Sequence, residues 1–198
     1  MIYRILRAYF PASKWDAIRE EMLAIHSQLK LGTVDDFSIF LSAVIDEKSF
    51  DRISGYIEGA KADPNCTIIA GGNCDKSKGM LDILSEIYLI WLGYFVEPTI
   101  IVTTDPNVVS MREEIFGPVL TVYVYDDDKM DETIELMSEN TRKSCTVLDS
   151  WYISCYSEFA LTGAIYCAQE SLVQELSMKL RQTAGNFYIN DKVIELNI

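Results

Sequence analysis

The chain has 198 residues and a formal net charge of −13 at pH 7. This length is enough for a sizeable hydrophobic core, and the hydrophobic and aromatic content excludes wholesale disorder. The acidic balance argues against a nucleic-acid partner, because phosphate binding needs clustered Lys and Arg. The longest apolar run, residues 87–95, is too short to cross a bilayer, so we expect no membrane span.

No targeting segment is predicted at the start of the chain, because the first eleven residues are too short for a secretory signal. The five cysteines form no C-x-x-C pair and fit the reduced thiols of an intracellular protein. The single histidine, His26, lies on a predicted helix. We expect it to be a structural or surface residue, and we predict no metal site and no histidine-based triad.

Hydrophobic residues at helical spacing predict a first helix after Pro11. Ser13 and Asp16 form a predicted capping box at its start, and Gly32 is predicted to stop it. A second helix is predicted to begin at the cap residue Asp46 and to bury one apolar face, made of Phe50, Ile53, Ile57 and Ala60.

Strands and helices alternate along the rest of the chain. Strands are predicted over 66–70, 94–103 (where Pro98 indicates an edge or a bulge), 119–125, 161–167 and 186–190, and helices after Pro106, over 130–138 and over 170–183. This alternation predicts an α/β fold with a mostly parallel sheet and flanking helices. Two stretches, about 80–92 and 142–159, interrupt the pattern.

The stretch MREEIFGPVLTVYVY, residues 111–125, is the most informative of the chain. Gly117 and Pro118 break the chain, and a run of strand-forming residues follows. This order predicts that Glu114 and Phe116 lie on a turn at the mouth of a sheet, where functional residues often lie. By pattern alone, the preceding acid Glu113 is expected to be a solvated surface residue.

Several segments resemble the aldehyde dehydrogenase superfamily, and within it the delta-1-pyrroline-5-carboxylate dehydrogenases (L-glutamate gamma-semialdehyde dehydrogenases). They are FLSAVIDEKSFDRI (40–53), TIIAGGNCD (67–75), GYFVEPTI (93–100), MREEIFGPVLTVYVY (111–125), LTGAIY (161–166) and AGNFYINDK (184–192). By this resemblance, residues 1–198 are a partial catalytic domain, in which the stretches 80–92 and 142–159 are insertions.

The resemblance implies oxidation of L-glutamate gamma-semialdehyde to glutamate with NAD, in proline catabolism and glutamate biosynthesis. It also implies a homo-oligomer and the mitochondrial matrix. Glu114 would hydrogen-bond the hydroxyls of the nicotinamide ribose, since a carboxylate accepts two donors at once. Phe116 would pack beside the nicotinamide, since an aromatic ring offers a flat apolar wall.

The family's nucleophilic cysteine lies in a G-Q-x-C motif shortly before the segment that begins at Arg7, and residues 1–6 hold no cysteine. We therefore assign no catalytic residue. Cys66 and Cys167 are expected in buried strands, and no other cysteine (Cys74, Cys145, Cys155) carries the signature of a reactive thiolate. The family's N-terminal NAD-binding region and C-terminal assembly region are also expected to be absent, so this chain alone should be inactive.

Two hypotheses stay open at this point. In the first, the chain is a piece of an NAD-dependent semialdehyde dehydrogenase, whose altered ends and two insertions indicate a misassembled coding sequence. In the second, it is a non-catalytic truncated paralogue that acts as a binding or interaction protein.

Overall fold

The computed structural model describes residues 7–33, 36–76, 93–140, 162–180 and 184–191. The two apparent insertions, 80–92 and 142–159, lie outside these ranges, as do Cys145 and Cys155. The described chain forms two compact units, one of residues 6–124 and one that begins at residue 125.

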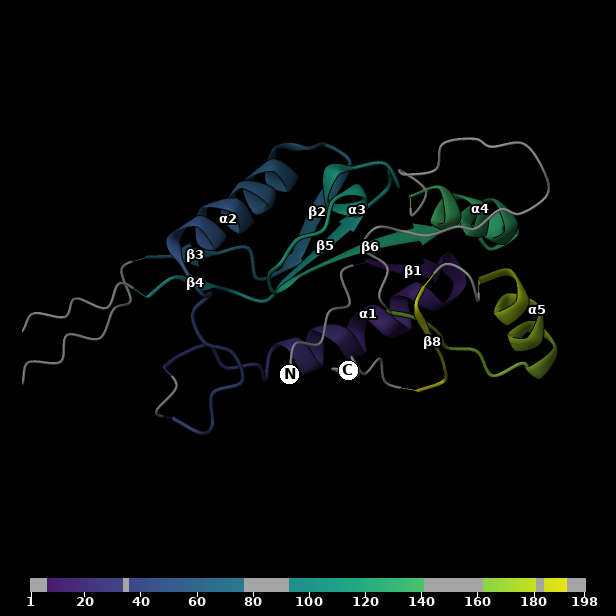
Figure 1. Cartoon of the computed structure of the whole chain (residues 1–198), viewed down its shortest axis with the longest axis horizontal. Coiled ribbons are helices and arrows are strands. Elements are labelled where there is room, and N and C mark those ends of the chain that lie inside the picture. Colours follow the sequence, from purple (N-terminus) through teal and green to yellow (C-terminus); the bar gives the residue numbers. More distant parts are fainter. Residues whose placement is uncertain (1–6, 34–35, 77–92, 141–161, 181–183, 192–198) are drawn as a thin grey trace, which may run out of the picture. The chain divides into compact units, whose positions relative to one another are not determined.

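The first unit is a four-stranded sheet with helices on both of its faces (Figure 1). Its elements are β1 (Arg7–Pro11), α1 (Ala12–His26), α2 (Glu47–Ala62), β2 (Cys66–Ala70), β3 (Cys74–Asp75), β4 (Phe95–Val96), β5 (Thr99–Thr103), α3 (Val109–Arg112) and β6 (Val119–Tyr125). The strand order is β1-β6-β5-β2, and β3 and β4 form a separate two-stranded pair.

The central strands of this sheet, β5 and β6, pair in parallel, with Thr99 opposite Val119. Strand β2 pairs antiparallel with β5 and brings Cys66 opposite Thr103. The predicted α/β fold with a mostly parallel sheet is thus confirmed, with β2 as an antiparallel neighbour.

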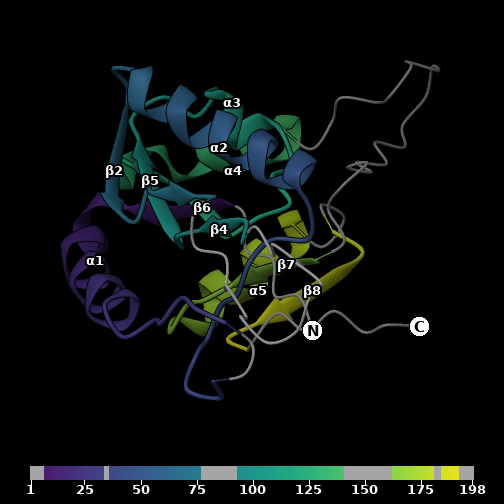
Figure 2. The ribbon, with the colours of Figure 1, turned by 90° about the vertical axis from the view of Figure 1, so that its left-hand side faces the viewer.

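Alternating side chains of β5 divide the core between the two faces of the sheet, as the two-residue period of a strand requires. Ile101 packs with the buried face of α2, whereas Ile100 packs with Trp15 of α1. Figure 2 shows the two helices on opposite sides of the strands. Helix α2 therefore covers one face of the sheet. It also lies against the segment that leads into β6.

Helix α1 differs at both ends from its prediction. It begins at Ala12, directly after Pro11, and no side-chain hydrogen bond caps its start, so the predicted capping box of Ser13 and Asp16 is wrong. The extended backbone of Pro11 leads straight into the helix and places Ser13 inside the first turn. The helix ends at His26 rather than near Gly32, because the backbone N–H groups of Gln28 and Leu29 donate to carbonyls three residues back, instead of four.

Two other expectations for the first unit are settled by hydrogen bonds. The carboxylate of Asp46 accepts a hydrogen bond of 2.7 Å from the backbone N–H of Ser49, which confirms the predicted cap of α2. His26 is structural: its Nε2 lies 2.7 Å from the carbonyl oxygen of Pro98 and links α1 to the segment between β4 and β5.

The strand predicted over 94–103 is two strands, β4 and β5, with Pro98 between them. A proline has no N–H to donate to a sheet, so the ladder stops at this residue. Strand β4 pairs with β3, a short strand that the sequence does not predict, and β5 pairs with β6.

The second unit contains a 3₁₀ turn, two helices and a parallel strand pair. They are η1 (Asp127–Lys129), α4 (Met130–Asn140), β7 (Thr162–Ile165), α5 (Glu170–Leu180) and β8 (Asn186–Ile189). Ile134, Ile165 and Leu180 form the buried centre of this unit. Since β7 ends at Ile165, the half-buried Cys167 lies beyond the strand, and its predicted place in a buried strand is wrong.

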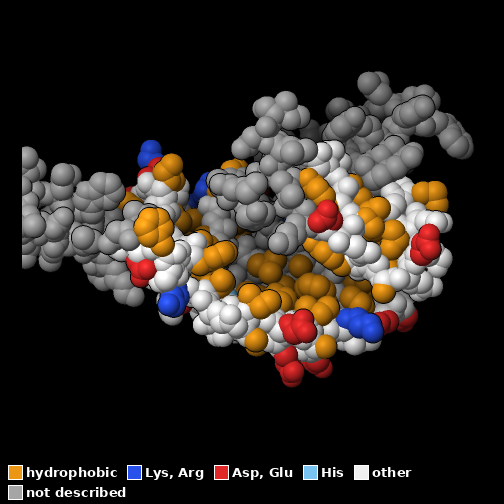
Figure 3. Space-filling view, turned by 90° about the horizontal axis from the view of Figure 1, so that it is seen from below, with side chains coloured by type: hydrophobic (Ala, Val, Ile, Leu, Met, Phe, Trp, Pro, Cys, Tyr) orange, Lys and Arg blue, Asp and Glu red, His pale blue; other side chains and the backbone are white. Residues whose placement is uncertain are grey.

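The surface of the described chain carries several exposed hydrophobic side chains. Phe37, Phe40 and Ile45 of the first unit are 101%, 71% and 91% exposed. Hydrophobic side chains also gather on the face shown in Figure 3. Within the described ranges, no helix is both long and apolar enough to cross a membrane.

Candidate functional site

The predicted turn lies between α3 and β6, in residues 113–118. It is held from both sides by buried hydrophobic side chains. Met111 precedes the acid pair and is fully buried, and Ile115 follows the pair and is 2% exposed. The acids are thus carried by a short backbone segment whose two ends are anchored in the core.

Gly117 brings the turn into direct contact with α2. A Cβ atom on Gly117 would lie 2.6 Å from Cδ1 and 2.8 Å from Cγ1 of Ile53, a side chain with no exposed surface. Glycine is therefore required here by a close approach between two segments. The Pro118 carbonyl accepts a hydrogen bond of 2.8 Å from the Thr99 N–H and joins the turn to β5.

The two predicted site residues, Glu114 and Phe116, both lie on this turn. Glu114 is half-buried, and Phe116 leaves 44% of its side chain exposed. The guanidinium carbon of Arg52, on α2, lies 5.6 Å from the centre of the Phe116 ring, within the range of a cation–π contact. Arg52 therefore holds one side of an aromatic ring that remains partly open to solvent.

Glu113 is exposed, as predicted, but it is also bound to α2. The hydroxyl of Tyr56 donates a hydrogen bond of 2.6 Å to its Oε2 atom. This bond raises the pKa of Tyr56 above its ordinary value, and burial adds to the shift. The phenol therefore keeps its proton at neutral pH and remains a donor.

Arg7, on β1, acts electrostatically on the other acid, Glu114. Burial lowers the pKa of Arg7, and the charges of Tyr9 and Glu114 oppose that shift. A buried guanidinium favours a negative partner, and Glu114 supplies a negative charge within electrostatic reach of Arg7.

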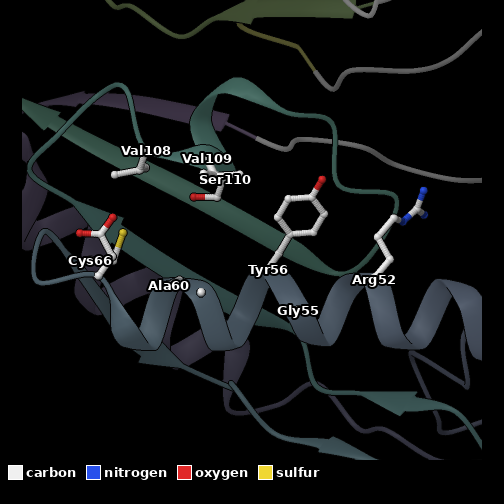
Figure 4. Close-up of a pocket in the computed structure, with 10 residues that line it drawn as sticks. Arg52, Gly55, Tyr56, Ala60, Cys66, Val108, Val109 and Ser110 are labelled. Atoms are coloured by element: carbon white, nitrogen blue, oxygen red, sulfur yellow. The ribbon is translucent and has the colours of Figure 1, made fainter.

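Arg52 and Tyr56 are the site residues that the sequence did not predict. They lie four residues apart on α2 and flank the buried Ile53, so they share one side of the helix. Figure 4 shows both side chains projecting from α2 on the side of the segment that carries Val109 and Ser110. Their positions beside the buried face of α2 could have marked them as contact residues. The sequence pattern does not, however, identify the segment that they contact.

A shallow groove of about 390 Å³ continues from these two residues along α2. It is lined mainly by small and apolar residues of α2 and of the segment that contains α3, together with the charged Arg52 and Asp63 (Figure 4). Gly55 and Gly59 leave open space above the helix, since a Cβ atom on either would meet nothing within 4 Å. The hydroxyl of Ser110 is buried and has no hydrogen-bond partner in the described part of the chain.

Cys66 places a thiol beside this site. Cys66 lines the groove, and burial raises the pKa of its thiol while a hydrogen bond with Thr103 opposes the shift. A neutral, half-buried thiol is a poor nucleophile. Among the described residues, no cluster of three or more His, Cys, Asp or Glu side chains could hold a metal ion.

The chemistry of the turn fits one end of a dinucleotide. A half-buried carboxylate can accept hydrogen bonds from two hydroxyls, and a partly open aromatic ring can cover a planar group. Glu114 and Phe116 therefore suit the expected ribose and nicotinamide. The turn carries no thiol, hydroxyl or amine side chain, and the role that we expect for its acids is binding and orientation.

Comparisons of the sequence with known proteins agree on one family. Residues 3–142 match the Aldehyde dehydrogenase family. The mitochondrial delta-1-pyrroline-5-carboxylate dehydrogenases of Danio rerio and Homo sapiens are 47% and 44% identical over 187 residues. Each alignment covers 94% of this chain and 28% of the relative.

Solved structures agree with these relatives. The crystal structure of the Delta-pyrroline-5-carboxylate dehydrogenase from Mycobacterium tuberculosis is 31% identical, with a TM-score of 0.76. The alignment covers 97% of this chain and 30% of the Mycobacterium tuberculosis chain. The same enzyme bound with NAD has a TM-score of 0.73 at 30% identity, and covers 97% of this chain and 29% of its own. The chain thus spans less than a third of the relatives that it matches.

Proposed function

Because the chain belongs to the aldehyde dehydrogenase family, we propose that it supplies the nicotinamide end of the NAD site in a glutamate gamma-semialdehyde dehydrogenase. Residues 1–198 would form part of that enzyme's catalytic domain. The turn that carries Glu114 and Phe116 against α2 is the observation on which the proposal rests. The names of the relatives support the substrate and a mitochondrial location.

The residues of this chain would bind and orient the cofactor. Glu114 would accept hydrogen bonds from the ribose hydroxyls, and Phe116, held by Arg52, would limit the movement of the ring beside it. When bound, NAD supplies the hydride acceptor. Positioning of the reactive atom is the part of such chemistry that a protein contributes.

The purified chain tests the cofactor contact directly. Saturation-transfer NMR detects weak binding, and we expect transfer from the chain to the nicotinamide and ribose protons of NADH. Glu114→Gln should reduce this signal, because an amide offers one acceptor atom where the carboxylate offers two. Glu135→Gln, an equal charge change on the exposed face of α4, should leave it unchanged. Equal signals from both variants would contradict the proposal.

We also expect the chain by itself to form no NADH from the semialdehyde. The covalent step of the family needs an activated nucleophile, whereas burial raises the pKa of Cys66, the thiol in the groove beside α2. An absorbance assay at 340 nm checks this expectation. NADH formation that depends on Glu114 would show that the chain is a complete catalyst.

A second candidate function is a non-catalytic interaction protein. It is favoured by Phe37, Phe40 and Ile45, three exposed apolar side chains within nine residues, because exposed apolar surface often marks a binding face. Mass spectrometry of native tissue distinguishes the two. Peptides from both 80–92 and 142–159 would favour the interaction protein, whereas transcripts that add a G-Q-x-C segment ahead of Arg7 would favour the dehydrogenase.

A further inference from the structure

We propose that Tyr56 is a positioning residue of the NAD site, which sets the direction of Glu114 through its hydrogen bond to Glu113. The inference rests on the proposed function and extends it to a residue that does not touch the cofactor. In this inference, α2 is the helix that holds the turn of residues 113–118 in place.

Three contacts join α2 to the turn within little more than one helical turn. Arg52 lies over the Phe116 ring at 5.6 Å, and Ile53 lies against Gly117. Tyr56 donates to Glu113 at 2.6 Å. Tyr56 lies three residues after Ile53 and four after Arg52, so it neighbours both on the helix surface, and the three contacts form one interface.

The contacts differ in what they restrain. The packing of Ile53 on Gly117 fixes how closely the two segments approach, and the Arg52 contact tolerates sliding across the ring. A short hydrogen bond to a carboxylate is directional and stronger than one between neutral groups. Tyr56 is therefore suited to fix the orientation of the acid pair.

The backbone links the direction of Glu113 to that of Glu114. Glu113 itself has extended backbone angles, with φ −105° and ψ 153°, and side chains on either side of such a linkage point to opposite sides. Because Tyr56 draws the Glu113 side chain toward α2, the Glu114 side chain is directed away from α2. Glu114 then lies within electrostatic reach of Arg7 on β1.

The test removes the hydroxyl and follows the turn in the free and the NADH-bound chain. In ¹⁵N-labelled protein, Tyr56→Phe should shift the amide signals of residues 113–116. It should also weaken NADH binding by about 3–10-fold, the range expected for the loss of one ordinary hydrogen bond, since this one is exposed to solvent. Tyr166→Phe is the matched control, since it removes a hydroxyl that donates at 2.7 Å to the Asp191 carbonyl in the other unit. It should change neither readout.

Variants of the acceptor separate positioning from simple loss of structure. Glu113→Gln keeps an acceptor for Tyr56 and should retain most of the affinity, whereas Glu113→Ala should behave like Tyr56→Phe. The double variant Tyr56→Phe/Glu113→Ala should be no weaker than either single variant, because both changes remove the same bond. Additive losses would overturn the inference.

The two readouts also distinguish this inference from the proposed function. If Tyr56→Phe leaves the amides of residues 113–116 in place, the positioning role is wrong, whether or not NADH binds. If those amides shift while NADH affinity stays unchanged, the bond does not control Glu114 and the inference is again wrong. If the unaltered chain binds no NADH, the proposed function fails and the positioning role for NAD fails with it.

Discussion

Gly117 and Ile53 touch so closely that the turn between α3 and β6 leaves no room for a side chain at residue 117. The nearest atom of Ile53 would lie 2.6 Å from an added Cβ, and Ile53 cannot move away, because its side chain is completely buried between α2 and the sheet. This contact sets the distance between the predicted cofactor turn and the helix that supports it.

Gly117→Ala should therefore destabilise the chain. The added methyl group forces α2 and the turn apart, and overpacking of a close-packed core costs about 1–3 kcal/mol of unfolding free energy. Urea denaturation followed by circular dichroism measures the loss. Stability equal to that of the parent chain would show that Ile53 can adapt.

Gly55→Ala is the matched control for that variant, since it makes the same substitution on α2 itself. An added Cβ there meets nothing within 4 Å. Alanine is favoured over glycine inside a helix by about 0.5–1 kcal/mol, so the free energy of unfolding should rise. Opposite signs for the two variants would separate the steric effect at the turn from any general effect of replacing glycine.

Asp46 should make the stability of α2 depend on pH. Its hydrogen bond from the Ser49 backbone N–H lowers the pKa of the carboxyl below the ordinary aspartate value of about 3.9. Between the two pKa values the unfolded chain binds more protons, so the cap stabilises the fold above about pH 4, and this contribution is lost as pH falls through the folded-state pKa.

Denaturation of the parent chain and of Asp46→Asn over pH 2.5–7 checks this expectation. Asparagine also caps helices but does not titrate, so the stability of the parent relative to the variant should fall with decreasing pH. A difference that stays constant across this range would show that the Asp46 cap does not titrate with folding.

Cys66 should be slow to alkylate in the folded chain. Burial raises the pKa of its thiol, and the thiolate is the species that reacts. Iodoacetamide labelling at pH 8, followed by peptide mass spectrometry, should modify Cys66 more slowly in the native chain than in guanidinium chloride. Equal rates would place a reactive thiol in the groove beside α2.

Local patterns predicted much of the fold. The apolar face of α2 and its Asp46 cap agree with the structure, because both depend on residues within a few positions of one another. Helix α1 was predicted less well at its ends, since Pro11 starts the helix earlier than the Ser13 signal indicates. The strand predicted over 94–103 is two strands, separated at Pro98. This division could not be predicted locally, because β4 pairs with β3 and β5 pairs with β6.

For this protein, the sequence by itself determined the α/β class, the family resemblance and the turn that carries Glu114 and Phe116. Each of these depends on patterns of residues that are close together in the chain. Only the tertiary structure decided what holds that turn. Tyr56 and Glu113 are 57 positions apart in the chain, and no local periodicity relates them. They meet because α2 packs on one face of the sheet, against the turn that precedes β6. This packing depends on the shape of the whole core.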